Sequence, residues 1–461
     1  MINLFDTAQN KIVPFETRKP NEVSMYICGP TVYGPPHLGH GRFALSFDIL
    51  RRYLEYSGFK VIHVSNITDI DDKIIQRANQ ENKLTSEIAS FFEAKWFEDM
   101  EKLNVLRPTF NPHATEYIDS MIDLINQLFN LDIAYAIDDG IYLEVAKVKN
   151  YGSLSNQDLE SLKSGARVDV NPYKRSPMDF TLWKHSKPGE PAWSSPFGMG
   201  RPGWHTECVV MSLQLLGEGF DLHGGAQDLI FPHHENELAQ AKALSKRFAN
   251  HWVHCGWVTV AGEKMSKSLD NYTTLDELLS AHDARSFRLL VLQSHYRSPL
   301  EITKETLKTA DVAVARLDSA FRRFKDSIDL DTLESDMGNI RQDYLKEFQT
   351  AMNNDLDTPR AMSLVFEIVT RSNALADIAN DVHKMKLATD EFKAALFICK
   401  VLGLDLKDTS NDLDQNTMNL IAKRDAARIS KDFKLADQIR DELSELGWVV
   451  EDTSSGTRVH K

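Results

Sequence analysis

Cysteine is scarce in this chain, which has only four in 461 residues: Cys28, Cys208, Cys255 and Cys399. Small secreted proteins that depend on disulfides use cysteine far more densely, so the sequence excludes a disulfide scaffold. Such sparse use favours a reducing compartment, and we expect a cytoplasmic protein. Cys255 and Cys399 lie in apolar runs and are expected to pack in the core.

Long hydrophobic runs are also missing. No stretch of about 18 consecutive apolar residues occurs, so we expect no membrane span and no membrane partner. The first residues, Met1–Asp6, contain no basic region followed by an apolar segment, and no signal peptide is expected.

Positive charge is in deficit, with 53 Lys and Arg against 67 Asp and Glu and a formal net charge of −14. This balance excludes a protein that holds nucleic acid through broad nonspecific attraction. A local basic face stays compatible with the sequence, because lysines and arginines recur between Lys423 and Lys461. Such runs are more often solvated helix faces, and the sequence alone leaves both interpretations open.

No Gly-x-Gly-x-x-Gly turn follows the first predicted strand, which excludes a simple dinucleotide-binding oxidoreductase. What the chain does have is an ordinary globular composition, with 42% hydrophobic and 26% charged residues. Its 461 residues predict about two to four domains.

The stretch from Cys28 to Arg42 is the most informative part of the first half. Val23–Ile27 is an apolar run typical of a strand, Gly and Pro follow, and apolar residues then recur at helical spacing up to Tyr56. His37 and His40 lie where this helix would begin. Helix N-termini suit phosphate groups, because their N–H groups are unpaired and their dipole end is positive. The stretch predicts a nucleotide-handling turn, while a purely structural turn with two surface histidines remains open.

A second strand is predicted over Lys60–Asn66, and an acidic segment, Ile67–Lys73, follows it. Strand, helix and strand in this order form a βαβ unit, whose ligands lie at the carboxyl ends of the strands. Cys28 and Thr68 would both lie at such ends. At least one of the aspartates after Thr68 is expected to cap a helix.

Residues 120–200 are predicted to be an insertion between two halves of a parallel sheet. Helical patterns cover Thr85–Leu103 and His113–Asn130, and Ala134–Val145 has the pattern of a β-hairpin. Residues 146–202 are rich in Ser, Pro, Gly and Lys, with only short apolar runs.

The second half of the sheet is predicted from residue 203 onward. Gly203–Cys208 leads into a helix through Leu216, and a strand is expected over Phe220–His223. Pro232 is expected to open a helix, and Trp252–Val260 is a further predicted strand.

A polar loop, residues 261–268, contains two lysines, and the hydrophobic pattern of the sequence changes after it. From Leu275 onward long helical patterns predict a helix bundle, and the next strand signal is Gly447–Asp452.

Cys28, Cys208, His233 and Glu237 form a candidate metal set. His233 and Glu237 are four residues apart, so in a helix they project from one face. His234, three residues from Glu237, is an alternative that spacing leaves open. Thiolate, imidazole and carboxylate ligands together suit zinc. Spacing alone nevertheless favours a structural interpretation, in which the cysteines pack as small hydrophobic side chains beside a polar helix start.

Two signatures give the sequence a resemblance to a known family. His37-Leu38-Gly39-His40 matches the HIGH signature, and Lys264–Ser268 matches KMSKS without a change. With the candidate metal set, they make the whole chain similar to class I aminoacyl-tRNA synthetases, and within them to the cysteinyl-tRNA synthetase family. Further segments that resemble this family are Cys28–Tyr33, Asn66–Lys73, Gly165–Val168, Gly203–Cys208, Phe231–Glu237 and residues 451–457.

The resemblance implies an α/β fold with a Rossmann-like parallel sheet split by a connective insertion, followed by a helix bundle and a small C-terminal anticodon-binding domain. It also implies a monomer. The implied parts are the first half of the catalytic domain (1–119), the connective peptide (120–200), the second half with the KMSKS loop (201–270), a stem-contact region (271–308), the helix bundle (309–405) and the anticodon-recognition domain (406–461).

The implied activity has two steps. L-cysteine and ATP give cysteinyl-adenylate and pyrophosphate, and the cysteinyl group then passes to the 2′-hydroxyl of the terminal adenosine of tRNA(Cys). His37, His40, Lys264 and Lys267 would be the catalytic residues, and Mg²⁺ would accompany ATP. By the same resemblance, His37, Gly39, His40, Gly41, Asp228, Lys264 and Lys267 would bind ATP, and Thr68, Trp204 and His205 would bind cysteine.

The resemblance also assigns a purpose to the metal set: one zinc ion, held by Cys28, Cys208, His233 and Glu237, would take the substrate thiolate. An apolar pocket would separate cysteine from serine by only about 10- to 200-fold. Zinc would discriminate more strongly between cysteine and serine, because the cysteine thiol deprotonates when it binds the metal and the serine hydroxyl stays neutral. No editing domain is therefore expected.

Two other functions remain open. A ligase that joins activated cysteine to an amino sugar shares the chemistry but lacks the C-terminal anticodon module, which this chain keeps in Ala427–Thr457. A catalytically inactive, zinc-stabilised tRNA-binding protein would have no need of His37, His40 and the two signature lysines. The chain departs from its relatives at Gly34-Pro35-Pro36 and at Arg458-Val459, where some carry a tryptophan.

Overall fold

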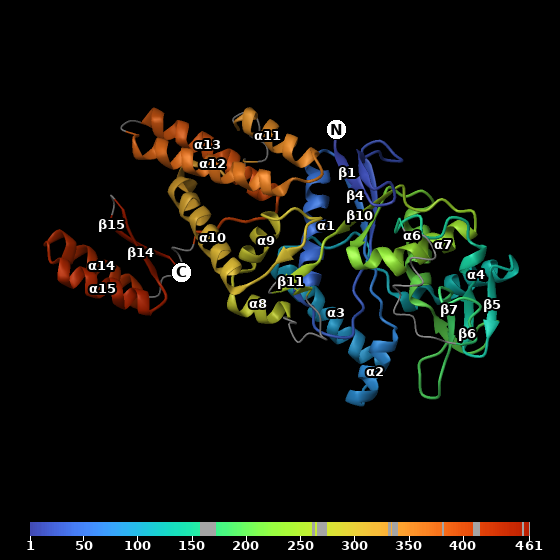
Figure 1. The fold of residues 1–461 in the computed structure, drawn as a ribbon. Coiled ribbons are helices and arrows are strands. Elements are labelled where there is room, and N and C mark those ends of the chain that lie inside the picture. The colour runs from blue at the N-terminus through green and yellow to red at the C-terminus, as the bar shows by residue number, and fades with distance from the viewer. Residues whose placement is uncertain are drawn as a thin grey trace. The chain divides into compact units, whose positions relative to one another are not determined.

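The structure is a computed structural model, and it describes residues 1–156, 172–260, 263–264, 274–330, 333, 340–379, 382–408, 415–453 and 456–460. The chain forms two compact units, whose elements are labelled in Figure 1. Unit 1 comprises Met1–Thr306, Glu347–Ala361 and Val401–Gly403, and unit 2 comprises Leu307–Lys346, Met362–Lys400 and Leu404–Lys461.

A four-stranded parallel sheet lies in unit 1, in the order β10-β9-β3-β4. Its strands are β3 (Glu22–Ile27), β4 (Lys60–Val64), β9 (Leu222–Ala226) and β10 (His251–Cys255). β3 and β4 come from the first half of the chain and β9 and β10 from the second, so the halves meet where β3 pairs with β9. Open α/β sheets bind their ligands at such a junction, beyond the carboxyl ends of the strands.

Helix α1 (Leu38–Tyr56) connects β3 to β4 and completes the predicted βαβ unit. It starts directly after His37, whose ring accepts the backbone N–H of His40, and it stops at Ser57. Gly58 follows with a φ of 90°, a conformation that favours glycine and ends the helix. Leu45 and Leu54 on the apolar side of the helix are fully buried.

Between β4 and β9 the chain forms helices and a second, antiparallel sheet in the order β5-β6-β7-β8. The predicted β-hairpin is confirmed as β5 and β6, and a Cβ at Gly140 in its turn would lie 2.1 Å from the Trp183 carbonyl. The pattern did not predict β7 and β8, because their apolar runs are short and flanked by Pro and Gly. The elements are α2 (Asp72–Glu81), α3 (Thr85–Lys102), η1 (Ala114–Tyr117), α4 (Ile118–Asn130), β5 (Ala134–Ile137), β6 (Gly140–Leu143), η2 (Val145–Lys147), β7 (Phe180–His185) and β8 (Gly200–Pro202).

Two predicted strands differ from the observed ones at glycines. The strand expected over residues 220–223 is β9, which continues through Gly224 and Gly225, where a Cβ at Gly224 would lie 2.4 Å from the Phe47 ring. The strand expected over residues 252–260 divides into β10 and β11 (Val258–Val260). Gly256 lies at the break, at a position where a Cβ would approach the Ser298 carbonyl to 2.6 Å.

The helix expected from Pro232 onward also starts later. Residues Ile230–His234 form a wide π-type turn in which Phe231 is extended, and α7 (Glu235–Ala243) begins after it. The extended residue interrupts the helical hydrogen bonds, so the two histidines lie on a turn that leads into α7. The remaining elements up to residue 301 are β1 (Asn3–Asp6), β2 (Lys11–Pro14), α6 (Trp204–Leu216), η3 (Gln227–Leu229), β12 (Glu263–Lys264), α8 (Leu275–Ala281), α9 (Ala284–Leu292) and β13 (Leu300–Glu301).

The last third of the chain is helical, as its pattern predicts. The strand expected near residues 447–452 is β14, and it pairs with β15, which the pattern did not predict. The segment that starts at α14 has its own small core, formed by Leu420, Ile439, Leu443, Trp448, Val450 and Val459. The elements are α10 (Lys304–Phe324), η6 (Lys325–Ser327), α11 (Gln342–Asn353), α12 (Thr358–Asp377), α13 (Val382–Val401), α14 (Gln415–Ile429), α15 (Phe433–Glu445), β14 (Val449–Thr453) and β15 (Gly456–His460).

Among the described residues, no helix is both long and apolar enough to cross a membrane. The finer domain limits expected from the resemblance stay a prediction.

Candidate metal centre and the residues around it

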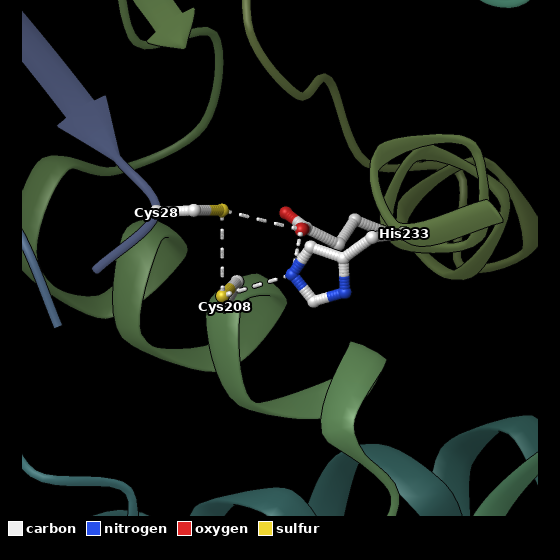
Figure 2. A group of neighbouring side chains, drawn as sticks. Cys28, Cys208 and His233 are labelled. Carbon is white, nitrogen blue, oxygen red and sulfur yellow. Dashed lines mark hydrogen bonds and ion pairs between the residues drawn. The ribbon is translucent and has the colours of Figure 1, made fainter. Parts of the chain in front are cut away.

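The four residues of the candidate metal set meet at the junction of β3 and β9. Cys28 follows β3, Cys208 lies in α6, His233 in the turn before α7 and Glu237 in the first turn of α7. Figure 2 shows the side chains of Cys28, Cys208 and His233 pointing toward one another. All four residues are buried, and their ligand atoms lie within 4.8 Å of one another. The fold thus brings together cysteines that are 180 positions apart.

The distances in this cluster can be compared with those around a tetrahedral zinc ion. Zn–S bonds of about 2.3 Å and Zn–N or Zn–O bonds of about 2.0 Å would place two sulfurs about 3.8 Å apart, sulfur and nitrogen or oxygen about 3.5 Å apart, and nitrogen and oxygen about 3.3 Å apart. The observed distances are 3.8 Å for Cys28 Sγ to Cys208 Sγ, 3.6 Å for Cys208 Sγ to His233 Nε2, 3.7 Å for Cys28 Sγ to Glu237 Oε1 and 3.0 Å for His233 Nε2 to Glu237 Oε1. The donor set therefore fits zinc in chemistry and in spacing.

Histidines outside the set hold its members in place. The second carboxylate oxygen of Glu237, Oε2, lies 2.7 Å from His223 Nε2. The second ring nitrogen of His233, Nδ1, lies 2.8 Å from His205 Nδ1. Such outer hydrogen bonds orient a ligand and leave its other donor atom directed at the metal.

A second set, Cys28, His223, His234 and Glu237, also has its ligand atoms within 4.8 Å. His234 Nε2 lies 3.2 Å from Cys28 Sγ, so the alternative left open by spacing has a geometric basis. His223 Nε2 and Glu237 Oε2, however, are 2.7 Å apart, which is further below the roughly 3.3 Å between two zinc ligands than the 3.0 Å between His233 and Glu237 in the first set. We therefore favour the set with Cys208 and His233.

Charge in the cluster is arranged around two anionic donors. Burial raises the pKa of Glu237, but His223 and His233 outweigh it and lower that pKa to about 2. Burial also raises the pKa of Cys208, while hydrogen bonds with Cys28 and His233 lower it to about 6. Burial lowers the pKa of His233, yet the neighbouring Glu237 and Cys208 raise it to about 10. The two anions thus hold a proton on His233, a positive charge that a bound divalent cation would replace.

The three residues expected to bind cysteine lie next to this cluster. Trp204 stacks on His233 with ring centroids 3.8 Å apart, and His205 bonds to the same ring. Thr68 is buried and donates its hydroxyl hydrogen to Glu207 Oε2 at 2.8 Å. The structure therefore places all three beside the candidate metal centre.

A cavity of about 690 Å³ opens next to these residues. Trp204, His205 and Glu207 line it on the side of α6, and Phe231 lines it on the side of the turn before α7. The second sheet contributes Thr181 and Lys184 from β7. Its size is in the range of small-molecule sites.

Sequence patterns missed two residues of this site, His223 and Glu207. His223 is a fully buried histidine inside β9, and Glu207 is a buried carboxyl in α6. Burial raises the pKa of Glu207 well above its usual value, and the hydroxyl of Thr68 is its hydrogen-bond donor. A polar residue within an otherwise apolar strand was the one available signal for His223, because buried polar groups need partners.

The signature histidines form a pair at the start of α1. The backbone N–H of His37 donates to His40 Nδ1 at 3.2 Å, and the N–H of His40 donates to His37 Nδ1 at 3.3 Å. The two rings stack with centroids 3.6 Å apart. Because Nδ1 accepts in both rings, each neutral ring carries its hydrogen on Nε2, where it can donate to an anionic oxygen.

The other residues expected to bind ATP lie in η3, α1 and β12, except for Lys267. Asp228 is exposed in η3, after β9, at the same edge of the sheet as Cys28. Gly41 is buried in α1, and a Cβ there would lie 2.7 Å from Leu275 and Phe287, so helix packing alone favours a glycine. Gly39 is in the first turn of α1. Lys264 contributes its backbone to β12, and Lys267 and Gly165–Val168 lie outside the described residues.

The fold is shared with solved class I synthetases at low sequence identity. Mycobacterium tuberculosis methionyl-tRNA synthetase in complex with methionyl-adenylate has a TM-score of 0.57 at 13% identity, over 83% of this chain and 89% of that one. A putative arginyl-tRNA synthetase from Campylobacter jejuni has a TM-score of 0.56 at 14% identity, over 86% and 95%. The leucyl-tRNA synthetase agnB2 of Agrobacterium radiobacter K84 has a TM-score of 0.59 at 9% identity, over 85% and 87%.

Three sequence families match the chain in order. Residues 14–312 match the family described as tRNA synthetases class I (C) catalytic domain, residues 347–407 the DALR domain, and residues 410–460 the cysteinyl-tRNA ligase anticodon binding domain. The first match covers more than half of the chain, and the third is specific to cysteinyl enzymes. The chain therefore belongs to the class I aminoacyl-tRNA synthetases, as a member of the cysteinyl-tRNA synthetase family.

Proposed function

We propose that this enzyme activates L-cysteine with ATP and transfers it to tRNA(Cys), and that a zinc ion at the candidate metal centre selects cysteine. The observation that carries the proposal is the buried set of Cys28, Cys208, His233 and Glu237, whose spacing suits zinc beside a cavity of small-molecule size. The anticodon-binding match at residues 410–460 supports tRNA(Cys) as the partner.

Zinc bound there would supply a thiophilic Lewis acid, which prefers the thiolate of cysteine to the neutral hydroxyl of serine. Cys28, Cys208, His233 and Glu237 would hold it. His223 keeps Glu237 Oε2 engaged, so that Oε1 points into the cluster. Trp204, His205 and Thr68 would surround the rest of the substrate, with Thr68 held by Glu207.

In the first step, a carboxylate oxygen of cysteine attacks the α-phosphorus of ATP, and the bond to the bridging oxygen of pyrophosphate breaks. This reaction needs donors and positive charge around the phosphoryl oxygens more than it needs acid–base chemistry. His37 and His40 would donate from Nε2 at the start of α1, where backbone N–H groups add positive potential. Lys264 and Lys267 would hold the β- and γ-phosphates, Mg²⁺ would accompany them, and Asp228 would bind the ribose hydroxyls.

In the second step, the 2′-hydroxyl of the terminal adenosine attacks the cysteinyl carbonyl carbon, and AMP leaves. We propose that the chain has the domain limits implied by the resemblance, and that residues 406–461 recognise the anticodon of the tRNA. We also propose that the enzyme acts as a cytoplasmic monomer.

The test is ATP–pyrophosphate exchange on the purified chain, with cysteine and with serine, beside the zinc content. We expect about one zinc per chain and exchange with cysteine but not with serine, since zinc must discriminate beyond the roughly 10- to 200-fold that an apolar pocket allows. Exchange with cysteine in zinc-free protein would contradict the metal-based selection. If folded, zinc-loaded protein showed no exchange, this would contradict the proposed cysteine activation and favour an inactive tRNA-binding protein.

An assay of tRNA(Cys) aminoacylation distinguishes the proposed function from the remaining alternative, the amino-sugar ligase. A ligase that transfers cysteine to an amino sugar would pass the exchange test and fail to acylate tRNA. We expect cysteinyl-tRNA, because residues 410–460 match an anticodon-binding domain.

A further inference from the structure

A second cavity, of about 320 Å³, lies in unit 1 between α1, α3 and the segment that follows α3. Its lining shares no residue with the candidate metal centre, the cavity beside Trp204, the signature histidines or Asp228. None of the residues assigned to aminoacylation lines it, although Trp96 of its wall packs edge to face against the His40 ring at 5.9 Å. Its volume is at the lower end of the range for small-molecule sites.

The cavity contains a buried histidine whose ring nitrogens find no hydrogen-bond partner in the part of the chain that the structure describes. His63 lies in β4 and is only 8% exposed. Its backbone is engaged, because its carbonyl accepts the N–H of Thr109 at 2.7 Å. Neither ring nitrogen, however, has a hydrogen-bond partner among the described residues. An unpaired buried polar group is costly and rare, so this ring calls for a ligand with a polar atom.

The walls of the cavity are aromatic and apolar. Phe43 and Phe47 lie on α1 with their rings edge to face, and Trp96, Phe97 and Met100 lie on α3. Aromatic walls of this kind favour a flat ring, which they contact by stacking or edge-to-face packing.

Four charged side chains line the cavity, and their charges sum to zero: Asp48 and Arg51 are ion-paired with other residues, and Glu101 and Arg107 carry opposite charges. Arg51 donates to Glu55 and to the Arg107 carbonyl, and the Arg107 guanidinium lies over the Phe97 ring at 3.8 Å. Asp48 accepts from Arg52 and from the backbone N–H of Leu106. With these charges balanced internally, the cavity suits a neutral ligand better than an ion.

We propose that this cavity is a second ligand site, which binds a small, neutral heteroaromatic molecule of one or two fused rings through the aromatic walls and a hydrogen bond to His63. A neutral imidazole offers one donor and one acceptor, so the ligand needs a ring N–H or a ring nitrogen lone pair. Burial and the Arg51 cation lower the pKa of His63 to about 3 despite Asp48, which keeps the ring neutral at physiological pH.

The test uses benzimidazole, which has both kinds of ring nitrogen, and indane, which has the same shape without nitrogen. Binding to the full, zinc-loaded chain is measured by calorimetry near neutral pH, without substrates. We expect benzimidazole to bind and His63→Phe to weaken it about threefold to tenfold, the worth of one hydrogen bond. Indane binding should be the same in both proteins. The exposed His383 provides the matched control, His383→Phe, which should leave both ligands unaffected.

Ala44, buried in α1 at the cavity wall, offers a second variant. Ala44→Leu should fill the space and remove binding of both compounds, and circular dichroism checks that the variant is folded. If Ala44→Leu does not fold, a crystal soaked with benzimidazole must show the ring against His63. No binding to the wild type would overturn the proposal, because the cavity then holds water only. Displacement of benzimidazole by saturating ATP and Mg²⁺ would also overturn it, since the compound would then occupy the nucleotide site. Neither result bears on aminoacylation, which is measured separately.

Discussion

Two of the places where unit 1 buries histidines differ in what the rings contact. In the candidate metal centre, His233 has Glu237 on one ring nitrogen and His205 on the other, at 3.0 and 2.8 Å. His63, beside α1, is also buried, but neither of its ring nitrogens has a partner among the described residues. The comparison shows that burial alone does not identify a histidine's role. Converging thiols and a carboxylate indicate a cation, whereas an isolated ring among aromatic walls indicates a neutral ligand.

The largest effect should come from removing one of the ligands of the candidate metal centre. We expect Cys208→Ser to lose its zinc and to lower cysteine-dependent exchange by about 10³-fold or more, because a Lewis acid contributes several kcal/mol. Zinc is measured by atomic absorption and exchange with labelled pyrophosphate. Cys399→Ala, a buried cysteine of α13, is the control and should keep both properties. Full zinc content in Cys208→Ser would contradict the ligand assignment.

The signature histidines sharpen the comparison, because they act on phosphate and not on metal. We expect His40→Ala to lower kcat of the exchange reaction by about 10²- to 10³-fold, the usual loss of a donor to a developing anionic oxygen. Zinc content and the KM for cysteine should stay unchanged, and steady-state kinetics with metal analysis checks both. A loss of zinc in this variant would mean that the two groups of histidines are not independent.

His223 tests whether the outer hydrogen bonds of the metal centre matter. We expect His223→Ala to weaken zinc binding by about 10- to 100-fold, since Glu237 Oε2 would lose its partner. Competition with a chromophoric chelator measures this affinity. An unchanged affinity would show that Glu237 is held by its backbone position alone, or that it does not bind the metal.

The smallest effect concerns the pH dependence of stability at His63. Its pKa in the folded protein is about 3 and its unfolded value is near 6.5, so the unfolded chain takes up a proton that the folded one excludes. Stability should therefore fall as the pH drops below about 6.5, by about 2 kcal/mol between pH 7 and pH 5 from this group. Other buried histidines, such as His205 and His254, also lower the stability at low pH, so urea unfolding at both pH values should show a loss about 2 kcal/mol smaller in His63→Phe than in the wild type. Equal losses would mean that the folded ring binds a proton.

Part of the fold follows directly from sequence pattern. The apolar run before Cys28 and the helical spacing up to Tyr56 are local signals, and β3, α1 and β4 are found where they predict them. The pattern fails where a tertiary contact decides the backbone. The predicted strand ends at Gly256, where the Ser298 carbonyl lies too close for a side chain, whereas β9 continues through its glycines. Phe231 is extended and delays the start of α7, and the local signal for this is Pro232, which disfavours helical backbone in the residue before it.

The candidate site also has parts that sequence pattern predicts and parts that it does not. Strand ends place Cys28 and Thr68 together, because carboxyl ends of parallel strands share one edge. Spacing cannot choose between His233 and His234, since offsets of three and four both face Glu237, and the choice rests on distances to Cys208 and His223. The resemblance supplied residues whose pattern carries no local signal, such as Trp204 and His205.

The most direct test of the central claim is the near-ultraviolet absorption of the cobalt-substituted enzyme during titration with cysteine and with serine. Co²⁺ accepts the same cysteine, histidine and carboxylate ligands as zinc and reports thiolate ligation through charge-transfer absorption. If the centre selects cysteine through its sulfur, cysteine should increase this absorption to saturation and serine should leave it unchanged. Equal spectra with cysteine and without it, in cobalt-loaded protein that still performs exchange, would contradict the account.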